Sequence, residues 1–443
     1  MFRRIAPPIA LALFIITLVP SFIGRAAAQN SAATKQDSAE TDSRFVVAQQ
    51  AISKNDFAAA VPLLVGFLKD HPGDSTAHFQ LGYCYGQLKR DDDALVEYRR
   101  AIEINPAFGD AHLNLGLKLL EKGDAAAAAA ELQRAADLTP NDAKLQMMAG
   151  SALEKSGDLA AATAQYEKAA ALDPTSFDAL FHWGVTLLRS GKPADAEIQL
   201  RAAIALRPES APAHLALANA LLAEKKSDAA AVQLTAYLKA NPNNADAHFQ
   251  LATLLAASGK STDALAELDR ADAISAPTLD RVKLRASILA SQQQWDAAIP
   301  ALNAAIAAAP RDASLHAELG SILMHKKDYP AAERELRRAL AIDSSLTPTL
   351  RDLASTVYLQ ENYSGTLDLL DLLARREPPH PIVLFMRATC YDKLQRKAEA
   401  VAAYQQFLDA EHNLSDKREA SDKEEFQATE RLKVLQKELS TKK

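Results

Sequence analysis

Four kinds of apolar or turn-forming position recur along this chain with a period of 34 residues. Prolines from Pro72 to Pro378 are separated by multiples of 34, and a second series, of Gly or Ala, starts at Gly82. A third series, almost entirely Ala, starts at Ala94, and a fourth, of Tyr and Leu, starts at Tyr98. Because the four series share one phase, the pattern predicts a repeated structural unit with small and bulky residues at fixed places.

The residues between these positions favour helices. Strand-forming residues are sparse and helix-forming residues are abundant, so an all-helical chain is expected. Gly recurs at one place inside the unit, which suits the left-handed residue that ends a helix, and proline at the end of the unit would stop a second helix. Small residues are expected where two helices approach closely. These turn glycines are Gly123, Gly157, Gly191 and Gly259.

These features resemble the tetratricopeptide repeat, a helix–turn–helix unit of 34 residues. The clearest match is the stretch LGYCY at 81–85, followed by Ala94, Tyr98 and Pro106. The resemblance covers eleven units from Thr41 to Leu414, and the tenth unit departs most from it. It implies an all-α fold: a right-handed superhelical solenoid of stacked helix–turn–helix repeats. No single unit can bury its own apolar face, so stacking must supply the core.

The last segment, 415–443, is predicted to form a charged amphipathic helix that caps the open end of the stack. Ala428, Leu432, Leu435 and Leu439 recur at spacings of four, three and four, which gives one apolar stripe. A solenoid needs such an end, because its last repeat would otherwise expose its apolar face.

The first residues have the three parts of a secretory signal peptide. Arg3 and Arg4 precede an apolar run at 9–23, and Ala26 and Ala28 are the small residues of a cleavage site. Residues 1–28 are therefore predicted to be removed on export, and the polar stretch 29–40 to be a disordered leader. An uncleaved anchor is the alternative. The expected location is the bacterial periplasm or cell envelope.

Composition and motifs argue against several classes of function. The chain has 50 Lys plus Arg against 56 Asp plus Glu, a net charge of −6, which does not favour nucleic acid as a partner. Two cysteines exclude a disulfide-stapled scaffold, and no phosphate-binding, metalloprotease or nucleophile motif occurs. We expect no enzyme activity, no cofactor and no metal.

Five histidines stand at the fourth position of their units, and we interpret them as half-buried packing residues. A metal ion would need its ligands within about 2 Å, whereas equivalent positions in stacked helices lie roughly 8–10 Å apart. The five are His78, His112, His214, His248 and His316.

The resemblance implies that the first helix of each unit lines an inner groove, mostly through positions 2, 5, 6, 9, 12 and 13. Position 5 is large and apolar in seven consecutive units: Phe45, Phe79, Leu113, Met147, Phe181, Leu215 and Phe249. Side chains beside it could hydrogen-bond a peptide backbone: Gln80, Asn114, His182, Asn219 and Gln250. The stripe ends at Lys283. Position 5 could instead serve only to pack on its neighbour, and both interpretations stay open.

The function expected from these features is an exported scaffold that binds protein or peptide partners in its groove, without catalysis. A second hypothesis is a structural component whose edge docks onto an outer-membrane, secretion or polysaccharide-export assembly. The sequence does not identify the partner.

Overall fold

The computed structural model describes residues 42–413 and 422–440, and all of its regular structure is helical. These residues form 23 α-helices and no strand. The predicted all-α solenoid is confirmed. The proposed signal peptide and leader lie outside the described residues. Within the described part, no helix combines the length and the apolar character that a membrane span requires.

The first helix of repeats two to eleven begins at position 1 of the 34-residue unit. Its N-cap is frequently an Asp or Asn whose side chain accepts a hydrogen bond from the first turn, as at Asp74 and Asn244. The first helices are α1 Ser43–Ser53, α3 Ser75–Gln87, α5 Gly109–Glu121, α7 Ala143–Ser156, α9 Phe177–Arg189, α11 Ala211–Ala223, α13 Ala245–Ala257, α15 Leu279–Ser291, α17 Ala313–His325, α19 Thr347–Leu359 and α21 Pro381–Lys393.

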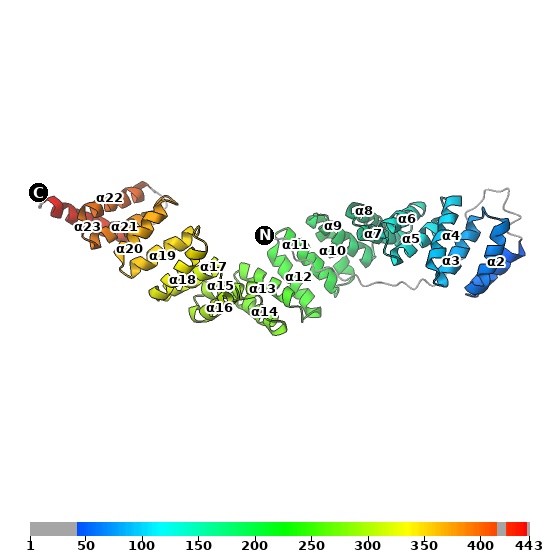
Figure 1. The fold of residues 1–443 in the computed structure, drawn as a ribbon, viewed down its shortest axis with the longest axis horizontal. Helices are drawn as coiled ribbons and strands as arrows, with labels where there is room; N and C mark the ends of the chain where they lie inside the picture. Colours follow the sequence, from blue (N-terminus) through cyan, green and yellow to red (C-terminus); the bar gives the residue numbers. More distant parts are fainter. Residues whose placement is uncertain (1–41, 414–421, 441–443) are drawn as a thin grey trace. The chain divides into compact units, whose positions relative to one another are not determined.

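The second helix begins at position 17 in all eleven repeats. In every repeat except the fifth, which contains the boundary between two bodies, it packs beside the first helix of its own repeat (Figure 1). The second helices are α2 Phe57–Asp70, α4 Asp91–Ile104, α6 Ala125–Leu138, α8 Leu159–Leu172, α10 Pro193–Leu206, α12 Ser227–Ala240, α14 Ser261–Ile274, α16 Trp295–Ala308, α18 Tyr329–Ile342, α20 Tyr363–Ala374 and α22 Lys397–Asn413.

The turn between the two helices has a left-handed residue at position 15 in every repeat. Gly occupies it four times, with φ between 74° and 92°, and residues such as Lys89 and Gln293 occupy it elsewhere with φ near 60°. A left-handed residue ends a helix sharply, and the second helix begins two residues after it in every repeat. The turn geometry therefore persists even where the sequence carries no Gly.

Small residues lie where the two helices of a repeat cross. At Gly82 an added Cβ would lie 2.8 Å from the Tyr98 ring, and at Gly116 it would lie 2.6 Å from Leu132. Ala94 and Ala128, on the second helices, are fully buried at the same crossings. The bulky residue of the fourth series fills the space that its small partner leaves.

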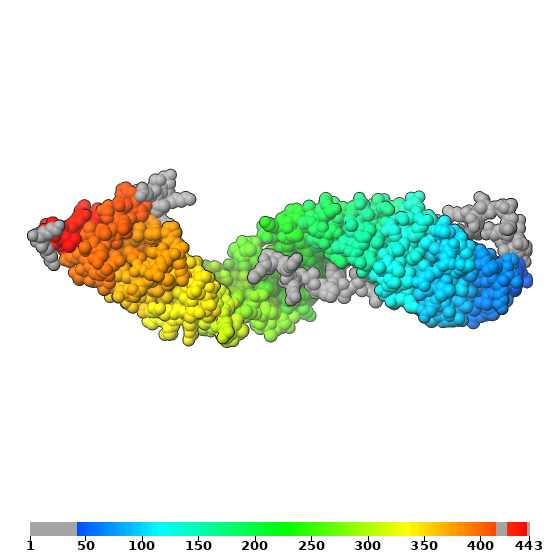
Figure 2. Space-filling model, turned by 45° about the horizontal axis from the view of Figure 1, so that its top comes forward, coloured from blue at the N-terminus to red at the C-terminus, as the bar shows by residue number. Residues whose placement is uncertain are grey.

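The chain divides at Thr186 into an N-terminal body and a C-terminal body. In the N-terminal body, one core cluster runs through the first three repeats, from Phe45 to Ala128. In the C-terminal body, another joins the eighth and ninth repeats through Leu302 and Leu319. Consecutive repeats of each body contact one another along the chain (Figure 2). Stacking thus supplies the apolar core.

Helix α23, Asp422–Ser440, packs on the last repeat. Its residues Ala428 and Leu435 are fully buried in a cluster with Tyr404 and Phe407 of α22. Arg431 donates two hydrogen bonds to Asp392 of α21, at 2.7 and 2.9 Å. The apolar stripe and this bidentate pair fix α23 against α21 and α22.

Candidate inner-face binding site

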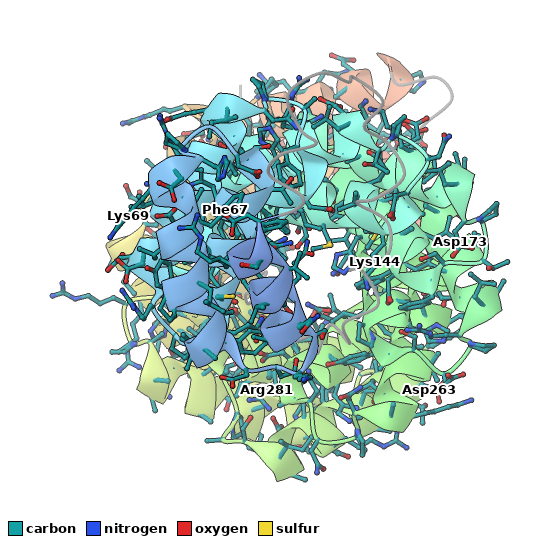
Figure 3. All side chains as sticks on the ribbon, turned by 90° about the vertical axis from the view of Figure 1, so that its right-hand side faces the viewer. Phe67, Lys69, Lys144, Asp173, Asp263 and Arg281 are labelled. Atoms are coloured by element: carbon teal, nitrogen blue, oxygen red, sulfur yellow. The ribbon has the colours of Figure 1, made fainter. Side chains whose placement is uncertain are left out.

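The first helices of the N-terminal body carry five of the seven apolar position-5 residues. Phe45 is only 6% exposed, because its ring packs on Phe67 with 4.9 Å between centroids. The other four are half-buried: Phe79, Leu113, Met147 and Phe181. Figure 3 shows Lys144 of α7 on the inner side of the helices, whereas Lys69 and Asp173 lie on the outer side.

The half-buried rings of this body contact their own repeat on one side. The Phe79 ring lies 5.9 Å from Tyr98 and 5.0 Å from Phe108. The Phe181 ring stacks on Phe177 at 5.6 Å. Such rings contribute packing and also leave part of their surface accessible. Half-burial therefore agrees with both interpretations of position 5 at these sites.

The polar side chains beside the apolar position-5 residues differ in whether they have hydrogen-bond partners within the protein. Asn114 Nδ2 donates to the backbone oxygen of Asp110 at 2.8 Å, within its own helix. The Gln80 Oε1 atom is buried and has no hydrogen-bond donor among the described residues. The His182 ring stacks on Tyr166 at 5.5 Å. Buried amide oxygens without a donor are costly, so the Gln80 side chain would gain free energy by turning its oxygen toward a donor.

In the C-terminal body the inner face changes from apolar to charged along the chain. Leu215, Phe249 and Gln250 are half-buried, and Asn219 is exposed. Lys283, the next position-5 residue, pairs with Asp312. Two repeats later, Arg351 pairs with Glu377 at 2.7 Å.

Carboxyl groups on the charged stretch are partly desolvated. Burial raises the pKa of Glu318, and the nearby Lys283 opposes this increase. Burial also raises the pKa of Asp352, opposed by Arg351 and His325. Both occupy position 6 of their repeats. The basic groups of Lys283 and Arg351 are held by other carboxylates, so they compensate these two only through the longer-range field.

The five fourth-position histidines connect their own repeats to the preceding ones. The Nδ1 atom of each ring lies 2.6–2.8 Å from a Glu or Gln oxygen at position 23 of its own repeat. Its Nε2 atom lies 2.8–3.2 Å from the carbonyl oxygen of the proline near the end of the previous repeat. The position-23 partners are Glu97, Glu131, Gln233, Glu267 and Glu335.

The sequence pattern predicts the histidines as a series, but not their position-23 partners. The signal was available, because every His at position 4 is accompanied by Glu or Gln 19 residues later. In repeat four, Gln146 replaces the His and its Nε2 donates to the oxygens of Ala136 and Pro140. These contacts give the histidines a structural role that satisfies carbonyls at the repeat junctions.

The junction before repeat eight uses a buried arginine instead. Ala276 stands there in place of the series proline. Arg281 is 3% exposed and donates to Asp272 Oδ1 at 3.0 Å, to Ser275 Oγ at 2.9 Å and to the Ala276 oxygen at 2.8 Å. The periodic pattern gave no sign of this network, because it depends on one irregular junction.

The cysteines and histidines form no reactive arrangement in the described residues. Cys84 and Cys390 are free and buried. Burial raises the pKa of Cys84 to about 12 and of Cys390 to about 11, so both thiols stay protonated near neutral pH. Within residues 42–413 and 422–440, no three His, Cys, Asp or Glu side chains converge as metal ligands would.

Comparison with protein families identifies the repeat. Models described as tetratricopeptide repeats match residues 113–177, 147–211, 181–234 and 284–346, and further ones match 82–123, 221–288 and 383–410. Together they cover 82–346 and 383–410. Among curated proteins, none matches the chain.

Several solved structures are similar to the chain at low sequence identity. YrrB, described as a TPR protein with an unusual peptide-binding site, is 23% identical; the match covers 42% of this chain and 96% of YrrB, with a TM-score of 0.38. Yeast Tom70 is 14% identical over 92% of this chain and 97% of its own, with a TM-score of 0.33. Pseudomonas aeruginosa PilF is 21% identical over 48% and 97%, with a TM-score of 0.36.

Proposed function

Since the chain belongs to the tetratricopeptide repeat family, we propose that it is a non-catalytic scaffold that binds protein or peptide segments on the inner face of its first helices. The observation that carries this proposal is the set of half-buried position-5 residues, which recur with the repeat and keep one side accessible. Apolar surface that recurs along a solenoid offers an extended chain a regular set of contacts.

The amide side chains beside the stripe support an extended peptide as the bound form. Gln80 has a buried oxygen that lacks a donor, and Gln250 is half-buried at the equivalent position. A peptide backbone offers an N–H group at every residue except proline, so it can supply the missing donor.

The test is affinity capture from a cell-envelope extract with the mature chain as bait. Phe181→Ala in the N-terminal body and Phe249→Ala in the C-terminal body should each weaken capture of a partner that occupies that body at least tenfold, or 1.4 kcal/mol. The matched control is Val96→Ala, since Val96 is a 60% exposed apolar residue on second helix α4. It should leave capture unchanged.

Each Phe variant also needs a melting curve, because truncation of a buried Phe costs about 3–5 kcal/mol. Weaker capture that tracks the loss of folded protein would assign Phe181 and Phe249 to packing. If Val96→Ala weakens capture as strongly and a short extended peptide fails to compete, the partner docks on another surface. That result would support a structural component of an outer-membrane, secretion or polysaccharide-export assembly.

Export is the second part of the proposal. Arg3 and Arg4, the apolar run at 9–23 and the small residues Ala26 and Ala28 support it. Intact-mass analysis of the native protein should give a chain that begins at Gln29, in a periplasmic or envelope fraction. A mass that retains Met1 would contradict cleavage and indicate an anchor.

A further inference from the structure

A cavity of about 410 Å³ lies in the C-terminal body, between the second helices of repeats six and seven. It is bounded by α12, the turn at Pro242, the start of α13 and α14. Its volume is within the range of cavities that hold small ligands, about 300–1,000 Å³. It is formed mainly by the second helices α12 and α14, so it is separate from the inner face of the first helices.

The lining is largely apolar, with polar groups on a few sides. The apolar residues of the lining are Leu238, Pro242, Leu251, Ala273 and Ile274. This surface can accept a hydrocarbon group and would gain free energy from removing it from water.

The one carboxylate in the lining is already compensated. Glu267 has a side chain that is only 10% exposed, and its Oε2 atom lies 2.6 Å from His248 Nδ1. Its Oε1 atom accepts a hydrogen bond from Arg270 Nη1. Both oxygens of Glu267 are therefore engaged within the protein.

Two cationic side chains in the same lining have donors to spare. The Arg270 side chain is 63% exposed and uses Nη1 for Glu267, which leaves its other N–H groups accessible. Lys239 has no carboxylate within ion-pair distance in the part of the chain that the structure describes. Since Arg270 balances the charge of Glu267, Lys239 is the cation of this lining that has no carboxylate partner, in a protein of net charge −6.

We propose that this cavity binds an apolar carboxylate, with the carboxylate group held by Lys239 and Arg270 and the hydrocarbon group on Leu238, Leu251 and Ile274. Arginine pairs with the planar carboxylate in a geometry that allows two hydrogen bonds. A phosphate or sulfate suits the cavity less, because its further oxygens would face the apolar lining unsatisfied. The shared chemistry fits a free fatty-acid anion and also the C-terminal carboxylate of an apolar chain end.

Isothermal titration calorimetry of the mature chain with octanoate tests the proposal, with octanol and octylamine as matched controls. We expect one octanoate per chain, and at least tenfold weaker binding of octanol and octylamine. A short peptide ending in Leu-Val is compared as the free acid and as the amide. Tighter binding of the acid than of octanoate identifies a chain end as the source, and the reverse order identifies a free anion.

Three variants locate the site. Lys239→Gln and Arg270→Gln should each weaken octanoate at least fivefold, and Ala273→Leu should abolish binding by filling the cavity. Ala273 is exposed, so the last variant should melt like the parent. The matched control is Arg338→Gln, because Arg338 pairs with Glu335 beside His316 in the same arrangement two repeats later, and it does not line this cavity.

Equal affinity for octanoate, octanol and octylamine would overturn the proposal, since it would show apolar adsorption only. Absence of octanoate binding at millimolar concentration would also overturn it. So would octanoate binding that Ala273→Leu and Arg270→Gln leave unchanged, which would place the ligand elsewhere. None of these results bears on the inner-face proposal, because its Phe181 and Phe249 variants lie outside this lining.

Discussion

At the scale of single residues, the space opposite each small residue decides which substitutions the repeat tolerates. Gly150 faces Tyr166, whose ring is fully buried, and an added Cβ would lie 2.8 Å from two of its ring carbons. Other repeats accept Ala at this position, as at Ala218, where the facing residue is Leu234. Repeat eleven has Ala388 opposite the buried Tyr404, so Ala fits beside a ring only where the crossing provides more room than it does at Gly150.

Gly150→Ala should therefore destabilise the protein by about 1–3 kcal/mol through overpacking against Tyr166. Gly73→Ala is the control, because nothing lies within 4 Å of the Cβ that it would add. Chemical denaturation of both variants measures the difference. Equal stability of the two variants would mean that the crossing in repeat four is looser than the structure shows.

Glu318→Gln should stabilise the protein at neutral pH. Burial raises the pKa of Glu318 above its ordinary value of 4.5, so the ionised form costs more in the folded than in the unfolded chain. As pH falls through the raised pKa, the folded chain takes up the proton first and this cost disappears. The gain in stability from Glu318→Gln should thus be largest near pH 7 and should disappear below pH 4.5. Thermal melts across pH 4–7 test this, and a constant difference would contradict the burial effect.

At this scale the sequence predicts residues that belong to one periodic series more readily than contacts that appear only when two positions of the repeat are compared. Gly82 and Tyr98 are each recognisable alone, since each belongs to a periodic series. The tie between His112 and Glu131 appears only when position 4 is compared with position 23. The half-burial of Phe79 could not be predicted, because it depends on the rings of Tyr98 and Phe108 together.

At the scale of helices, the residues at which the helices begin follow the 34-residue period, because the turn between the two helices has the same left-handed residue in every repeat. The left-handed residue at position 15 fixes where the first helix ends, and the second helix begins two residues later. The period therefore predicts most helix positions. It does not predict the junction at Ser275–Thr278, where Arg281 replaces the contacts that His makes elsewhere. A buried arginine that occurs at only one junction cannot be detected from the periodic pattern.

Helix α23 should be held mainly by its apolar stripe. Leu435 is fully buried against α22, whereas its neighbour Val434 is 44% exposed. Leu435→Ala should cost about 2–5 kcal/mol, and the matched Val434→Ala much less. Hydrogen exchange of α22 measures the effect, because Tyr404 and Phe407 lose cover when α23 detaches. Unchanged exchange of α22 in Leu435→Ala would show that α23 does not protect the last repeat.

At the scale of the whole chain, the contacts of each repeat are almost entirely with its immediate neighbours. The strongest helix–helix contacts are within a repeat or between consecutive repeats, as for α3 with α4 and α6 with α7. The stability of such an array is approximately a sum of repeat stabilities and nearest-neighbour interfaces. Perturbation of one repeat should therefore decay over one or two repeats and should not spread through the chain.

Ala162→Leu tests this expectation. Ala162 is fully buried at the helix crossing of repeat four, so the larger side chain should overpack it at a cost of about 1–3 kcal/mol. Hydrogen exchange followed by mass spectrometry should speed up in residues 143–176 and in the adjoining repeat 109–142, and should stay at the parent rate in 313–346. Ala125→Leu, at the half-buried start of α6, should have a smaller effect everywhere. A uniform increase across all repeats would mean that the chain unfolds as one cooperative unit, and a larger effect from Ala125→Leu would contradict the register of the repeats.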